Sequence, residues 1–265
     1  AGFIGSHTSL RLLEDEHHLL VFDDFSNSTP LAIDRVRQLA GAEAASRLQL
    51  MEGDIRNPAH LEKAFTNRTS KIDAVIHFAG LKSVGESMLN PMSYWDVNVN
   101  GSRCLLETMQ RNDCNVLVFS STATIYGYPE AVPIPETAPT QAINPYGHTK
   151  AAVEQMLADI QVSAPNRWRI ACLRYFNPVG AHPSGLIGEN PLGTPNNLFP
   201  LVCQVAVGRR DKLQVFGGDW PTPDGTGVRD YIHVMDLADG HCAALNCLMA
   251  EAPQILTLNL GTGQG

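Results

Sequence analysis

The sequence places Tyr146 and Lys150 four residues apart, after a hydroxyl-rich run that includes Thr122. Residues i and i+4 share one face of a helix, so we expect the phenol and the ammonium group to lie side by side. A free phenol has a pKa of about 10, and it acts as a base only where a nearby cation stabilises the phenolate. Lys150 can supply that cation, and Thr122 offers a hydroxyl to the same site. These three residues predict a proton-transfer site.

The first residues, Gly2-Phe3-Ile4-Gly5, match the last part of a Gly-x-x-Gly-x-x-Gly fingerprint. Such glycines let the backbone N–H groups of a helix N-terminus approach the pyrophosphate of a dinucleotide. Asp23, at the end of the next apolar run, can accept hydrogen bonds from the adenosine ribose and repel the 2′-phosphate of NADP. The combination predicts an NAD site. The alternative interpretation is a tight turn and a surface carboxylate.

Two further segments, Gly53–Arg56 and Phe78–Lys82, follow the expected third and fourth strands of the sheet. Open α/β sheets bind ligands outside the carboxyl ends of their strands. We therefore expect Asp54 to contact the adenine and Lys82 to contact the cofactor phosphates. Either residue alone would fit a solvated loop position equally well.

Short apolar runs alternate with helical periodicities along the chain, a pattern typical of a parallel sheet covered by helices on both faces. The expected strands are Leu19–Phe22, Leu48–Met51, Ala74–Phe78, Val116–Phe119, Ile170–Leu173 and Ile255–Leu260. The predicted fold class is α/β, with a doubly wound parallel Rossmann-type sheet and a smaller loop-rich substrate-binding region.

Glycine and proline become frequent between residues 177 and 227, which predicts loops laid over the strand ends. We expect an NAD-binding Rossmann domain at residues 1–176 and a substrate-binding region at residues 177–265, some elements of which return to the sheet. The chain opens on an incomplete fingerprint without methionine and stops at a glycine-rich stretch. We therefore expect an internal part of a longer protein, with the first strand missing and the second region incomplete.

Composition narrows the classes of partner. The 19 Lys and Arg residues against 27 Asp and Glu residues give a net charge of −8, which disfavours nucleic acid. No apolar run is long enough to span a bilayer, so no membrane partner is expected. The six cysteines are scattered through apolar runs and indicate reduced thiols in the cytoplasm. The sequence has no paired Cys/His ligands, so no metal site is expected. His77, inside an apolar strand, is expected to be a hydrogen-bonded core residue.

A Tyr-x-x-x-Lys pair after the fifth strand, preceded by a hydroxyl cluster, is the motif of the short-chain dehydrogenase/reductase family. Four further runs, Ala79–Ser87, Arg174–His182, Pro195–Leu198 and Asp224–Val234, occur in the expected order. Together they resemble the UDP-glucose 4-epimerases, which are extended members of that family, and the resemblance covers essentially the whole chain.

The resemblance implies roles for individual residues. Tyr146 would be the base, Lys150 its electrostatic partner and a nicotinamide-ribose ligand, and Thr122 the hydroxyl at the reacting sugar oxygen. The implied NAD-binding residues are Gly2, Phe3, Ile4, Gly5, Asp23, Asp24, Asn27, Ser28, Asp54, Ile55, Phe78, Ala79, Gly80, Lys82, Asn98, Tyr146, Lys150, Tyr175 and Phe176. The implied substrate-binding residues are Lys82, Thr122, Tyr146, Asn177, Asn197, Leu198, Gln214, Phe216 and Arg229. Two positions depart from the family: it commonly has Ser where this chain has Thr122, and some members have Asn where it has Val97.

The activity implied by the resemblance is NAD-dependent, reversible C4 epimerisation of UDP-glucose and UDP-galactose through a transient 4-keto sugar, by a cytoplasmic homodimer. One alternative is a nucleotide-sugar 4,6-dehydratase, which commonly has an Asp-Glu pair where this chain has Ala123-Thr124. The other is a non-catalytic NAD sensor, which need not retain Tyr146 and Lys150. Whether N-acetylated sugars are accepted is not decided by these residues.

Overall fold

Parallel strand pairs form the framework in the computed structural model, which describes residues 1–66, 70–193 and 195–265. A four-stranded sheet has the order β3 (Ala74–His77), β4 (Val116–Thr122), β5 (Arg169–Tyr175), β8 (Gln254–Leu260). A second sheet pairs β1 (Leu19–Asp23) with β2 (Leu48–Glu52), and a third pairs β6 (Asn177–Val179) with β7 (Tyr231–His233). All six strands predicted from apolar runs are present.

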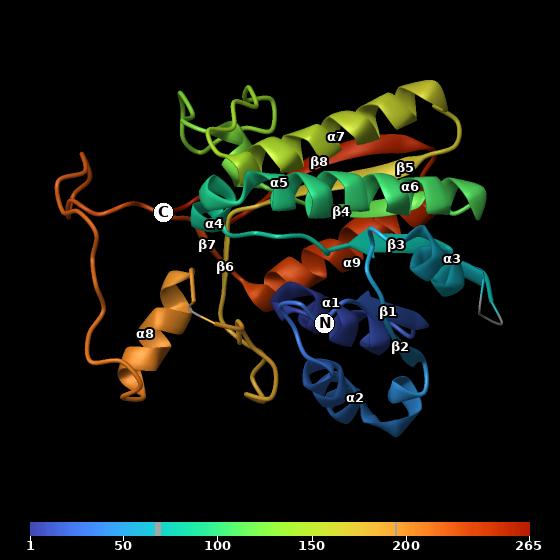
Figure 1. Ribbon diagram of the computed structural model, residues 1–265, viewed down its shortest axis with the longest axis horizontal. Helices are drawn as coiled ribbons and strands as arrows, with labels where there is room; N and C mark the ends of the chain where they lie inside the picture. Colours follow the sequence, from blue (N-terminus) through green and yellow to red (C-terminus); the bar gives the residue numbers. More distant parts are fainter. Residues whose placement is uncertain (67–69, 194) are drawn as a thin grey trace.

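Helices cover both faces of the four-stranded sheet (Figure 1). On one face lie α3 (Pro58–Thr66), α6 (Gly101–Arg111) and α7 (Pro145–Ser163), and on the other lie α1 (Phe3–Glu14) and α9 (Val234–Ala250). Every residue of β4 is buried, because side chains on both sides of this strand pack against helices. The doubly wound α/β fold predicted from the sequence is confirmed.

The single predicted sheet is, however, divided in two. In the described part of the chain, no strand pairs with both β1 and β3. The β1–β2 pair is joined to the remainder by side-chain packing of Leu10 and Leu13 of α1 against Ile33 and Val36 of α2 (Pro30–Ala45) and against β2. Helix α1 in turn packs on α9. Burial of apolar side chains therefore holds the two sheets together without backbone hydrogen bonds between them.

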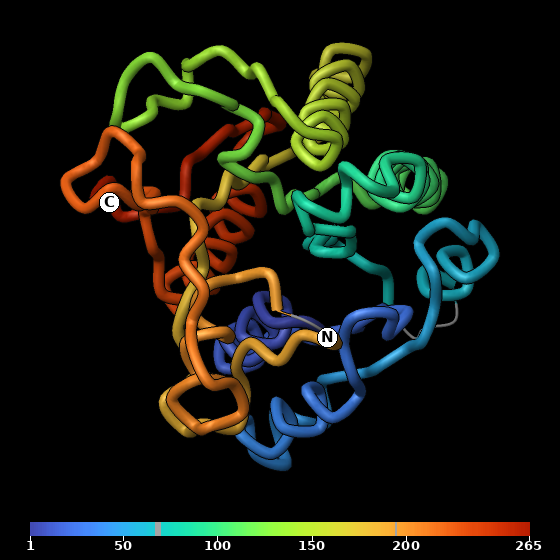
Figure 2. The backbone as a smooth tube through the Cα atoms, turned by 60° about the vertical axis from the view of Figure 1, so that its left-hand side comes forward, coloured from blue at the N-terminus to red at the C-terminus, as the bar shows by residue number. Residues whose placement is uncertain are grey.

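The region after residue 176 contains more regular structure than the sequence predicted. Strands β6 and β7 are only three residues long and pair across more than fifty residues, so no local pattern reveals them. Helix α8 (Leu198–Ala206) has no fully buried residue. Figure 2 shows this region, yellow to orange, running along one side of the molecule past α1. Helix α9 packs on the four-stranded sheet, and strand β8 forms one edge of it.

Short helices connect β3 to α6: α4 (Val84–Leu89), α5 (Pro91–Tyr94) and the π-helical η1 (Trp95–Asn100). A 3₁₀ turn, η2 (Ala123–Tyr126), follows β4. His77 is buried and its Nε2 lies 2.8 Å from the Ser102 hydroxyl, as predicted for a core histidine. All six cysteines are free, and four of them are buried. Within the described residues, no helix has the length and apolar character needed to cross a membrane.

Candidate active site

A cavity of about 1830 Å³ lies between the two larger sheets and parts of the segment that runs from the end of β5 to β7. The N-terminus of α1 opens into it. Gly2, the N-cap residue, has no side chain to cap this helix, so the first backbone N–H groups of α1 face an anion site. A methyl group added at Gly5 would stand 3.4 Å from the Phe78 ring, an ordinary van der Waals contact, and one added at Gly2 would meet no atom within 4 Å. This end of α1 fits a pyrophosphate group.

Asp23 ends strand β1 and lines the same cavity. One carboxylate oxygen accepts hydrogen bonds from the Ser28 hydroxyl at 2.7 Å and the Phe25 backbone N–H at 2.8 Å. These bonds orient the carboxylate at the end of β1, beside the helix terminus, where a ribose joined to the pyrophosphate would lie.

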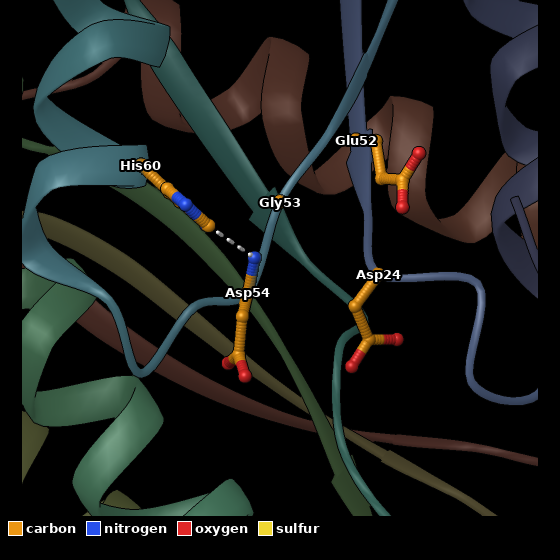
Figure 3. A pocket seen from close by; sticks show the side chains of 5 residues that line it. All are labelled: Asp24, Glu52, Gly53, Asp54 and His60. Carbon is orange, nitrogen blue, oxygen red and sulfur yellow. Dashed lines mark hydrogen bonds between the residues drawn. The ribbon is translucent and has the colours of Figure 1, made fainter.

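A smaller pocket lies next to this carboxylate, between the ends of β1 and β2 (Figure 3). Its lining includes Asp24, Glu52, Asp54 and His60, with Gly53 at the back. A side chain at Gly53 would stand 2.4 Å from the Phe22 ring, so glycine lets the ring occupy this position.

Asp54 is held by two groups. The Arg56 guanidinium donates to its carboxylate at 2.6 and 3.0 Å and lowers the pKa of Asp54, so the group is an ionised acceptor at neutral pH. The Asp54 backbone N–H donates to His60 Nδ1 at 3.3 Å. Such a carboxylate fits an exocyclic amino group, as on adenine.

The proton-transfer residues predicted from the sequence meet at the N-terminal end of α7. This helix begins with Pro145, and the Asn144 side chain accepts the Gly147 N–H at 2.9 Å. The first turn and the next therefore present Tyr146 and Lys150 to the cavity. Lys150 is 5% exposed, and its ammonium group donates to the Ser120 carbonyl at 2.7 Å.

Burial sets the acidity of both groups. Loss of hydration lowers the pKa of Lys150 to about 8, although the charge of Glu154 acts in the opposite direction. Burial also raises the pKa of the Tyr146 phenol, and hydrogen bonding with the Thr122 side chain partly offsets this. Without another source of stabilisation, the phenol is therefore protonated at neutral pH.

Thr122 is the last residue of β4, where the chain turns into η2. Its hydroxyl oxygen accepts the Thr124 backbone N–H at 3.1 Å, and the hydroxyl donates to Thr124 Oγ1 at 3.0 Å. The side chain is therefore oriented locally, and it lines the cavity with Tyr146 and Lys150.

Tyr175, the last residue of β5, lies against a buried histidine. His241 Nδ1 lies 2.7 Å from the Leu237 carbonyl, so Nδ1 carries the hydrogen and Nε2 accepts the Tyr175 hydroxyl. Burial lowers the pKa of His241 to about 4, which keeps the ring neutral. The Tyr175 ring is thus held at the floor of the cavity.

Predicted substrate residues come from the segment after β3, from β6 and from the chain between β6 and β7. Lys82 donates to Glu189 at 3.2 Å, and the Asn197 amide donates to the same carboxylate oxygen. The Asn177 amide donates to the Asp230 carbonyl at 3.0 Å. The neighbouring Arg229 side chain is exposed and lines the cavity. The cavity lining therefore includes two cationic side chains, Lys82 and Arg229, and two amides, Asn177 and Asn197.

Most of the predicted site residues line this one cavity, which brings together Gly2, Phe3, Ile4, Gly5, Asp23, Asp24, Asn27, Ser28, Asp54, Ile55, Phe78, Ala79, Gly80, Lys82, Thr122, Tyr146, Lys150, Tyr175, Phe176, Asn177, Asn197, Leu198 and Arg229. Three are not: Asn98 is buried elsewhere, and Gln214 and Phe216 are exposed on the loop after α8, where Phe216 is 81% exposed. This loop contains no helix or strand to carry them inward.

Asn98 is buried but does not line the cavity. Its amide nitrogen donates to the Leu81 carbonyl and to Thr149 Oγ1, both at 3.0 Å, and its oxygen accepts the Leu81 N–H at 2.8 Å. Its contacts within the protein thus join the loop after β3 to α7.

Sequence reasoning missed Glu154, Arg174 and Glu189. Glu154 follows Lys150 by one helical turn, and this spacing is a signal that would have found it. Glu189 lies in a loop without periodicity, so its approach to Lys82 has no local signal.

The chain matches the model of the NAD dependent epimerase/dehydratase family over residues 1–261. The chain belongs to this family. It is 54% identical to the bifunctional UDP-glucose 4-epimerase and UDP-xylose 4-epimerase 3 of Arabidopsis thaliana, a match that covers 100% of this chain and 75% of the relative. It is 55% identical to UDP-glucose 4-epimerase 2 of the same plant, with the same coverage.

Solved structures of the epimerase/dehydratase family agree with these matches. The UDP-glucose 4-epimerase of Bifidobacterium longum, solved in complex with NAD⁺ and UDP, superposes with a TM-score of 0.94 at 47% identity. The match covers 100% of this chain and 77% of that structure. The family resemblance inferred from the sequence and the Rossmann-type fold are confirmed, and NAD is the cofactor of the family.

Proposed function

We propose that this chain catalyses the NAD-dependent, reversible C4 epimerisation of UDP-glucose and UDP-galactose through a transient 4-keto sugar. The observation that carries the proposal is the meeting of Tyr146, Lys150 and Thr122 in one cavity with the free N-terminus of α1. A proton-transfer group and an anion site for a dinucleotide then face the same space. NAD, when bound, supplies the acceptor for the sugar C4 hydride and returns it, so no external oxidant is consumed.

The backbone N–H groups after Gly2 would hold the pyrophosphate, Asp23 the adenosine ribose and Asp54 the adenine. Tyr146 would take the proton of the sugar C4 hydroxyl and later give it back. With its pKa at about 8, Lys150 is mostly protonated at pH 7 and would stabilise the phenolate. Thr122 would hold the reacting oxygen through its hydroxyl.

Epimerisation requires the keto sugar to present its opposite face, so the nucleotide must be anchored more firmly than the sugar. Asn177, Asn197 and Arg229 would anchor UDP, with the planar Arg229 guanidinium suited to the diphosphate. We also assign NAD binding to residues 1–176 and UDP-sugar binding to residues 177–265.

The residues after Thr122 favour epimerisation over 4,6-dehydration. Elimination of water across C5 and C6 needs an additional acid and base beside the reacting carbon. Ala123 and the Thr124 side chain, which is hydrogen-bonded to Thr122, provide neither.

The test is the substitution Tyr146→Phe, with Tyr128→Phe as the matched control because the Tyr128 side chain is 79% exposed. Loss of the proton-transfer group should lower turnover of UDP-galactose by about 10²–10⁴-fold while NAD remains bound. Products are separated by ion-pair chromatography. Near-normal formation of UDP-glucose by Tyr146→Phe contradicts the assignment, a dehydrated keto sugar from the unchanged protein supports the dehydratase, and no product supports the sensor.

We further propose that the protein is a cytoplasmic homodimer. Helices α4 and α5 expose Met88, Leu89 and Met92, at 61%, 81% and 75%, a cluster suited to burial against a second copy. The free cysteines, four of them buried, are typical of a reducing compartment. Sedimentation of the unchanged protein and of Met92→Glu tests the dimer, since the charge should shift the protein to monomer. A monomeric unchanged protein contradicts it.

A further inference from the structure

A buried ion pair lies directly behind Lys150. The Arg174 guanidinium of β5 donates to both oxygens of the Glu154 carboxylate of α7, at 2.6 and 3.1 Å. The Glu154 and Arg174 side chains are 12% and 8% exposed. Neither residue lines the cavity, and neither is a partner of any ligand assigned above. We propose that Glu154, held by Arg174, is a positioning residue that fixes the Tyr146–Lys150 helix against the end of β4.

The contacts of Glu154 span the two elements that carry the reacting groups. The Ser121 hydroxyl of β4 donates to the same carboxylate oxygen that Arg174 Nε reaches. Ser121 stands between Ser120, whose carbonyl accepts the Lys150 ammonium group, and Thr122. One carboxylate therefore fixes the strand end to the helix on the side opposite the cavity, one helical turn beyond Lys150.

Arg174 extends the same network to the loop after η2. Its second terminal nitrogen donates to the Tyr126 hydroxyl at 2.8 Å and to the Glu136 carbonyl at 3.1 Å. The Tyr126 hydroxyl donates onward to Asn259 of β8 at 2.7 Å. Every charged donor and acceptor of the pair thus has partners, which is the condition under which a buried ion pair holds a defined geometry.

Burial of two charges is weak evidence for stabilisation, because desolvation offsets their attraction. A positioning role explains why the ion pair is present although it contributes little to stability. It also has an electrostatic consequence, since the charge of Glu154 raises the pKa of Lys150 against the effect of burial. The titratable groups that face Lys150 are Glu154 and Tyr146 on α7 and His77 on β3, and burial lowers the pKa of His77 to about 3, so that ring is neutral.

The experiment compares Glu154→Gln with the unchanged NAD-bound protein. Its matched control is Glu107→Gln, which removes an exposed carboxylate paired with Arg103 on α6. We measure bound NAD, KM for UDP-galactose, and kcat from pH 6 to pH 10. Glu154→Gln should lower kcat by at least tenfold with NAD content and KM within twofold. The alkaline limb of kcat should also move to lower pH, because Lys150 then loses its proton more readily.

Glu154→Asp should keep the alkaline limb in place, since it retains the charge. If Glu154→Gln does not fold, the paired change Glu154→Leu with Arg174→Met removes both charges together, and its kcat should be at least tenfold lower. A folded variant with unchanged kcat and an unmoved alkaline limb overturns the inference. A fall in kcat that is equal at every pH, with no movement of the limb, also overturns the electrostatic part.

The inference rests on the roles proposed for Tyr146 and Lys150, and the two can fail separately. Normal turnover by Tyr146→Phe refutes the proposed function. Normal turnover by Glu154→Gln, with Tyr146→Phe inactive, refutes only the positioning role.

Discussion

Lys150 should destabilise the folded protein that needs it for activity. The residue is 5% exposed, and burial lowers its pKa from 10.5 to about 8. Each pKa unit corresponds to about 1.4 kcal/mol, so folding with a protonated Lys150 costs about 3 kcal/mol at neutral pH. Lys150→Met removes this cost but also removes the charge-assisted hydrogen bond to the Ser120 carbonyl, which contributes about 1.5–3 kcal/mol. We expect a net stabilisation of about 1 kcal/mol at pH 7, with loss of turnover.

The change with pH in the stability difference between the two proteins provides a sharper test than the sign of that difference at one pH. Between pH 8 and 10.5 the unfolded chain holds the lysine proton more tightly than the folded protein does, so the stability of the unchanged protein rises with pH relative to the variant. Between pH 7 and pH 9.5, the free energy of unfolding of the unchanged protein should rise by about 2 kcal/mol relative to that of Lys150→Met.

The assay is urea denaturation of both proteins, followed by circular dichroism at pH 7, 8.5 and 9.5. Lys71→Met is the control, because the Lys71 side chain is 56% exposed and its removal should leave stability unchanged at each pH. A difference between the unchanged protein and Lys150→Met that does not vary with pH would refute the argument from burial.

Further expected outcomes follow from single contacts. Asp23→Gly should narrow the preference for NAD over NADP by about tenfold, because it removes the carboxylate that repels a 2′-phosphate. The affinities for both cofactors are measured by fluorescence titration. Equal affinity of the unchanged protein for NAD and NADP would contradict this. Leu157→Ala should lower the free energy of unfolding by about 2–5 kcal/mol, because Leu157 is fully buried between α7 and the sheet. Val162→Ala on the same helix, where the side chain is 76% exposed, should change it by less than about 0.5 kcal/mol, and equal losses in the two variants would show that the core is misplaced.

The sequence by itself determined the features that depend on local geometry. A strand of buried apolar residues such as Val116–Phe119 and a helix that places Tyr146 and Lys150 on one face are set by residues a few positions apart, so the sequence pattern predicts them. Gly2 and Gly5 at the start of α1 and the carboxylate at Asp23 were predictable for the same reason, because a helix start and a strand end are local features.

Only the tertiary structure decided which distant residues meet. The Glu154–Arg174 pair and the contact of Lys82 with Glu189 join segments that are distant in the chain. No periodic pattern of residues predicts such contacts. The pairing of β6 with β7 and the exposure of Phe216 were likewise invisible, since each depends on where a long loop returns to the sheet. The burial that lowers the pKa of Lys150 belongs here too, because desolvation is produced by every element packed around the ammonium group rather than by its neighbours in the chain.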